Sequence, residues 1–159
     1  MRRAGLAVSA VLLFSLVAQA AAATDISRDE YRERVEPICK ANTEANERIL
    51  AGARNRVRAG EYGKAAAQFR SAAKALKRTR LQLLAVPMPA GDEPKLSEWL
   101  DGVKAEVGLL ERVGQALTKG DLYAAQKLVV KLSTNANRTN AGVLAFEFTY
   151  CWFQPSLYT

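Results

Sequence analysis

The chain of 159 residues has no histidine, only two cysteines and no nucleotide-binding motif. Without histidine it cannot build a Ser-His-Asp or Cys-His catalytic arrangement, a histidine zinc site or a histidine-ligated haem. Two cysteines are too few for a four-thiolate metal site, and neither a Walker loop nor a GxGxxG sequence occurs. The sequence therefore predicts a protein that is not an enzyme and carries no metal or cofactor.

Residues 1–23 have the pattern of a secretory signal peptide. Arg2 and Arg3 form a positive start, and an apolar run from Gly5 to Ala18 follows, ending in alanine-rich cleavage sites at 18–20 and 21–23. An uncleaved anchor helix is the alternative, although the run is short for a membrane span. We expect cleavage to leave residues 24–159 as a single domain, located outside the cytoplasm as a secreted, periplasmic or cell-wall protein.

After cleavage, no further apolar run approaches the length of a membrane span, so no transmembrane segment is predicted in the mature chain. Loss of Arg2 and Arg3 would lower the formal net charge from +7 to +5. The protein is therefore expected to stay basic, which favours anionic partners. Its oligomeric state is left open by the sequence.

Apolar residues recur three and four positions apart in four long stretches, which predicts an all-α fold. The expected helices cover 28–59 with a kink at Pro37, 62–84, 93–119 and 122–142, the last weakening around 135–137. Short glycine turns before the second and fourth helices, and a proline-rich link at 86–91, favour an up-down-up-down four-helix bundle. An irregular aromatic tail is expected to follow.

Cys39 and Cys151 are predicted to form one disulfide, because an even pair in an exported protein is usually oxidised. Free thiols or a redox pair remain the alternatives. In a regular bundle the two sulfur atoms would lie some 15 Å out of level, at about 1.5 Å per helical residue. A disulfide therefore requires either a break in the last helix near Gly142 or a bend of the first helix at Pro37.

Half of the twelve aromatic residues lie between Phe146 and Tyr158, and four of them alternate with other residues. This period of two argues against a continued helix. The tail is interpreted as an extended or irregular cap over one end of the bundle, attached through Cys151. A strand or patch that binds a partner is the alternative.

Basic residues dominate from Arg54 to Arg80, where nine of them stand against a single acid, whereas six acids follow between Asp92 and Glu111. Four of the basic residues follow one helical stripe: Arg70, Lys74, Lys77 and Arg78. This stripe is a candidate site for an anionic envelope polymer or for lipid head groups. Alternatively, the basic and acidic blocks neutralise each other across neighbouring helices. Nucleic acid is not expected as a partner, since no aromatic residues interleave the stripe and the chain has an export signal.

Asparagines occur on the predicted apolar stripes, with Asn42 and Asn46 on the first helix. Buried asparagines can set the register of a bundle. They can also line a polar pocket, so an alternative function is the transport of a small apolar ligand in the core, between Asn42, Asn46 and Trp99.

The layout is similar to that of small exported bacterial helical-bundle proteins of uncharacterised function. The shared features are the export signal, a Tyr31…Ile38-Cys39 segment, the proline-rich link, a Gly120-Asp121 turn and one cysteine near the C-terminus. Trp152 follows that cysteine here, where a glycine often stands in those proteins. The resemblance implies a bundle but no activity.

Overall fold

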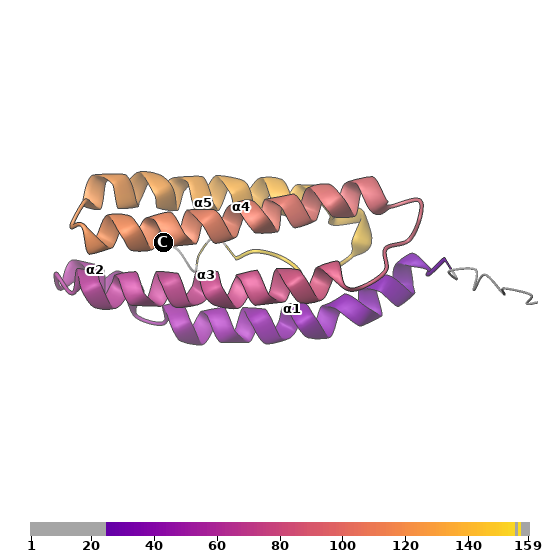
Figure 1. Cartoon of the computed structure of the whole chain (residues 1–159), viewed down its shortest axis with the longest axis horizontal. Coiled ribbons are helices and arrows are strands. Elements are labelled where there is room, and N and C mark those ends of the chain that lie inside the picture. Colours follow the sequence, from indigo (N-terminus) through magenta and orange to yellow (C-terminus); the bar gives the residue numbers. More distant parts are fainter. Residues whose placement is uncertain (1–24, 155, 157–159) are drawn as a thin grey trace, which may run out of the picture.

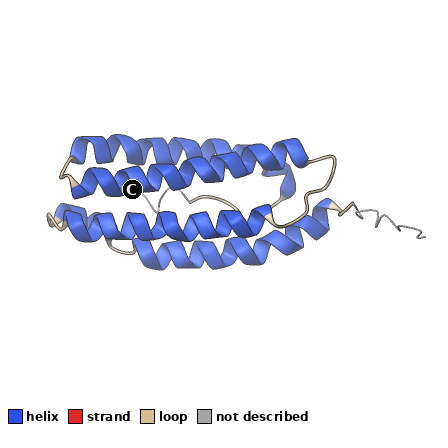
Figure 2. Cartoon of the chain, viewed as in Figure 1, coloured by secondary structure: helices blue, strands red, loops and turns tan. Residues whose placement is uncertain are grey.

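The computed structural model describes residues 25–154 and 156, and the predicted signal peptide lies outside the described residues. The described chain is helical, with no strand among those residues (Figures 1 and 2). Its elements are α1 (Arg28–Leu50), α2 (Ala53–Arg58), α3 (Tyr62–Leu84), α4 (Glu93–Thr118), α5 (Leu122–Gly142) and a short 3₁₀ helix η1 (Leu144–Phe146). The four long helices pack as the predicted bundle.

The predicted helices 62–84 and 122–142 have the expected bounds. The bounds of the first predicted helix, 28–59, were wrong. The first helix does not continue to residue 59: it runs through Pro37, ends at Leu50, and α2 restarts at Ala53. The helix is interrupted at Gly52, whose φ of 72° lies in the left-handed region that glycine adopts readily. The predicted weakening around 135–137 is also wrong, because α5 is continuous to Gly142.

The helix starts follow the local sequence signals. Ser27 precedes α1 and its hydroxyl accepts a hydrogen bond from the amide of Glu30 at 3.1 Å, while Asp121 caps α5 by accepting from the amide of Ala124 at 2.9 Å. Both contacts satisfy amides that a helix start leaves without a partner. A proline in the first turn of α4 loses no helical hydrogen bond there.

The helices form a bundle in which three of the four neighbouring pairs pack closely. The helix α3 packs against α1 and α4, and α4 packs against α5, whereas α1 and α5 barely touch each other directly. Figure 1 shows the C-terminal tail running back between the α4–α5 layer and the α1–α3 layer. Within the described residues, no helix combines the length and the apolar character that a membrane crossing needs.

An ion pair joins the starts of α1 and α4. The Arg28 guanidinium donates to both carboxylate oxygens of Asp92, at 2.7 and 2.8 Å, and lies 5.0 Å from the ring centre of Phe146. The Asp92 side chain is largely buried, and its hydrogen bond from Arg28 lowers the pKa of that carboxyl below its ordinary value. The contact therefore links two helices and the tail.

Asp92→Asn is expected to lower the free energy of unfolding at pH 7, because the ionised carboxylate is the form that Arg28 binds. The native pKa lies below the unfolded value, so this contribution is present above about pH 4 and disappears as the pH falls through the native pKa. Urea titrations at several pH values test this. Asp101→Asn is the matched control, since that exposed carboxylate lies 4.0 Å from Arg80. A gap between wild type and Asp92→Asn that does not narrow in acid would contradict the assignment.

Candidate functional site

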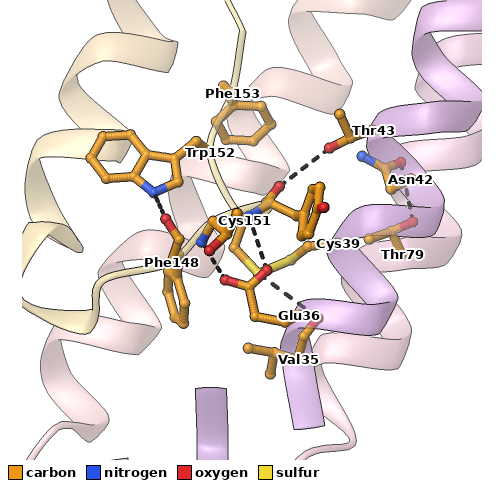
Figure 3. Close-up of a disulfide and its surroundings, with 12 residues drawn as sticks. Val35, Glu36, Cys39, Asn42, Thr43, Thr79, Phe148, Cys151, Trp152 and Phe153 are labelled. Atoms are coloured by element: carbon orange, nitrogen blue, oxygen red, sulfur yellow. Dashed lines mark hydrogen bonds between the residues drawn. A yellow bond between two sulfur atoms is a disulfide. The ribbon is translucent and has the colours of Figure 1, made fainter. Parts of the chain in front are cut away.

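The disulfide predicted from the sequence is present, and it attaches the tail to the middle of α1 (Figure 3). Cys39 and Cys151 are bonded, with their Cα atoms 4.9 Å apart. The geometry is reached because α5 ends at Gly142, one of the two alternatives that the sequence left open, and the chain then turns back through η1. Both cysteines are buried. The sulfur atoms are therefore structural and do not form an exposed redox pair.

Polar contacts hold the rest of the tail against α1 and α5. The Glu36 carboxylate accepts hydrogen bonds from the backbone amides of Thr149 and Tyr150 (Figure 3). On the other side, the Asn140 side chain both donates to and accepts from the backbone of Phe153, at 2.9 Å in each case. The tail thus occupies the space between two helices that do not pack closely against each other.

The aromatic residues of the tail cover the bundle core along the space between α1 and α5, and not one end of the bundle as the cap interpretation predicted. Phe146 and Phe148 are buried, and the Phe148 ring lies 5.5 Å from the Trp99 ring and from the Phe146 ring. The indole nitrogen of Trp152 donates to the carbonyl of Phe148. Among the tail aromatics that the structure describes, Tyr150 is exposed, at 39%, and Trp152 and Phe153 are half-buried.

Two of the three predicted ligand-pocket residues line a hollow beside the disulfide, and Asn46 does not. Asn42 and Trp99 line it, together with Thr79, but its volume is about 30 Å³, close to the space that one water molecule takes in the liquid. The side-chain oxygen of Asn42 accepts from the Thr79 hydroxyl at 3.2 Å and from the side-chain amide of Asn46 at 3.3 Å. Asn42 therefore links α1 to α3, and Asn46 donates to it from the same helix.

A buried acid in α4 was missed by the sequence reasoning. The Glu106 side chain is fully buried and accepts a hydrogen bond of 2.6 Å from Asn135, which also donates to the carbonyl of Gly102 at 3.0 Å. Its spacing could have revealed it, because it falls in the three-and-four repeat of α4 between Val103 and Leu110. The contact joins α4 and α5.

The predicted anion-binding residues lie together on the solvent side of α3. Arg70, Lys74, Lys77 and Arg78 are all exposed. At spacings of three and four residues the same stripe continues to Leu81 and Leu84, whose side chains are 59% and 44% exposed. We name these six residues the α3 face. The sequence predicted the four basic residues of this face but not the two exposed leucines.

The acidic block of α4 does not neutralise the α3 face. Only Arg80 of α3, which is outside the face, reaches an acid of that helix, lying 4.0 Å from Asp101. Arg70 donates to the hydroxyl of Thr118 at 2.8 Å, a neutral partner. Lys74, Lys77 and Arg78 have no acid of the described chain within ion-pair distance. The face therefore presents net positive charge.

A second feature, found only in the structure, is an apolar groove at the end of the bundle where α2 lies. It has a volume of about 450 Å³ and lies among α2, α3, α4 and α5. Its lining consists of Ala53, Arg54, Val57, Phe69, Val113, Leu117, Leu122, Ala125, Gln126, Val129 and Val130. Because it joins four helices through side chains far apart in sequence, no single periodicity could predict it.

Within residues 25–154 and 156, no three acidic, cysteine or histidine side chains are grouped so that they could hold a metal ion. No family model, curated protein or solved structure matches this chain.

Proposed function

We propose that the protein is a non-enzymatic binding module that acts outside the cytoplasm and contacts an anionic envelope surface through the α3 face. The observation that carries the proposal is the run of exposed, unneutralised basic residues that continues into two exposed leucines. Basic side chains are attracted to phosphate-bearing surfaces, and adjacent apolar side chains can enter the boundary between head groups and acyl chains. The disulfide supports a location in an oxidising compartment.

Lipid head groups and soluble wall polymers share the anionic chemistry that the basic residues would recognise. The two leucines favour a lipid surface, because a hydrated polymer offers them no apolar phase to enter. Their contribution is separable from the charge. Leu81→Ser with Leu84→Ser should weaken binding to vesicles while leaving binding to a soluble polyphosphate unchanged, if the surface is a lipid.

The combined variant Lys74→Ser, Lys77→Ser and Arg78→Ser is expected to lose about a hundredfold in binding to vesicles that contain phosphatidylglycerol. Each basic residue near an anionic surface contributes about 1 kcal/mol, so three contribute about 3 kcal/mol. Co-sedimentation with such vesicles, against pure phosphatidylcholine vesicles, measures the loss. Wild-type binding should also fall as salt rises.

The matched control removes the same charge elsewhere. Lys119, Lys127 and Lys131 are exposed and lie outside the α3 face. Their replacement by serine should reduce binding far less, since the surface would still meet the intact α3 face. Equal losses in the two triple variants would mean that net charge alone drives the binding. Retained binding after the α3 changes would overturn the proposal.

A further inference from the structure

The groove among α2, α3, α4 and α5 exists because one side of the bundle is incompletely filled. In a regular four-helix bundle the first and last helices pack along their length. Here α1 ends at Leu50, α2 has only six residues, and α1 and α5 barely touch directly. The tail closes the space at the Cys39–Cys151 level, while the space beside α2 remains open as the groove.

The walls of the groove are suited to an alkyl chain. Nine of its eleven lining residues are apolar, and these nine come from four helices. The volume of about 450 Å³ lies within the range of about 300–1,000 Å³ that is typical of sites for small organic ligands. Replacement of the water in an apolar groove by a hydrocarbon chain is favourable, because it removes apolar surface from water.

The rim of the groove is suited to an anion. Arg54 is the only charged residue in its lining, and no acid lines it. Arg54 is exposed and has no acid of the described residues within ion-pair distance. A guanidinium in this position can bind a carboxylate or a phosphate with two parallel hydrogen bonds.

We propose that this groove binds an amphiphile with a single alkyl chain and an anionic head group, the chain lying against Phe69, Leu117 and Val129 and the head group at Arg54. A second copy of the protein fits the site less well. Of the large apolar residues in the lining, only Leu122 and Val130 are exposed, which leaves little surface for an interface of about 800 Å² per partner. The inference does not depend on the α3 face.

The test uses the full disulfide-bonded protein and three probes: palmitate, hexadecyl phosphate and hexadecanol. Calorimetric titration and native mass spectrometry should show one bound molecule of either anion, with hexadecanol bound several-fold more weakly. Arg54→Ala should weaken the binding of both anions roughly three- to tenfold and leave hexadecanol unchanged. Arg58→Ala is the matched control, because it removes the same charge from the same short helix but does not line the groove.

Ala125→Trp should fill the groove and lower the affinity for all three probes more than tenfold. Ala67→Trp, at an exposed position of α3 outside the groove, controls for the added indole, and far-UV circular dichroism checks that both variants fold. If Ala125→Trp does not fold, the comparison of Arg54→Ala with Arg58→Ala still tests whether the groove binds the anions. Lys74→Ser, Lys77→Ser and Arg78→Ser should leave palmitate binding intact, which separates this site from the α3 face.

Three results would overturn the inference. They are the lack of saturable palmitate binding, equal binding by the two tryptophan variants, and equal losses from the two arginine changes. A fourth concerns the chain itself, because Ser156 lines a hollow that also includes Arg54. Palmitate binding that appears only after removal of residues 157–159 would assign the groove to the end of this chain and not to an external amphiphile.

Discussion

Replacement of both Cys39 and Cys151 by alanine is expected to lower the free energy of unfolding by about 4 kcal/mol. The bond closes a loop with a sequence separation of 112 residues. In the chain-entropy model a loop of that size stabilises a protein by about 4–5 kcal/mol, because the cross-link restricts the unfolded ensemble. The expected loss is a large fraction of the roughly 5–15 kcal/mol by which most domains are stable. Urea denaturation of the double variant and of the reduced wild type measures it.

Glu36→Gln serves as the control for this disulfide experiment. The Glu36 carboxylate accepts two backbone amides of the tail, at Thr149 and Tyr150, without involving sulfur. Loss of its charge should weaken tail attachment by about 1 kcal/mol and leave the cross-link in place. A double cysteine variant that is no less stable than Glu36→Gln would show that the tail is held by its packing and hydrogen bonds alone.

Gly102→Ala is expected to destabilise the protein by about 2–3 kcal/mol, although alanine is the better helix former. A Cβ atom at this position would lie 2.2 Å from Oγ1 and 2.6 Å from Cγ2 of Thr139 on α5. The threonine side chain is too short to swing away, so the two helices must separate. Separation would also weaken the hydrogen bonds of Asn135 to Gly102 and Glu106. Thermal and urea unfolding report the loss.

Gly108→Ala provides a matched control on the same helix. A Cβ atom there would meet nothing within 4 Å. This substitution should stabilise the protein by up to about 1 kcal/mol, the difference in helix propensity between alanine and glycine. Thr139→Ala should recover part of the loss caused by Gly102→Ala. Similar effects of the two glycine substitutions would contradict the close approach of α4 and α5 at Gly102.

The bounds of the helices were largely predictable because their signals are local. The Gly-Glu and Gly-Asp turns, the proline-rich link and the serine cap all act within a few residues, and α3, α4 and α5 begin within about two residues of the positions that they indicate. The end of the first helix was misjudged, because it was expected at residue 59 and the left-handed Gly52 interrupts the helix earlier. A glycine inside a helical pattern can be tolerated or can end the helix, so its position alone did not show the break.

Composition, spacing and the two cysteines were enough to predict an all-α bundle with an aromatic tail, a disulfide and a basic stripe on one helix, because each of these depends on periodicity or on a single pair. Only the tertiary structure decided that Glu106 enters the core, that the basic stripe stays unneutralised, and that a groove opens beside α2. Those features depend on the distances between helices and on how side chains from different helices fill the space between them. Such distances are set by packing across the whole bundle and leave no mark in the pattern of any one segment.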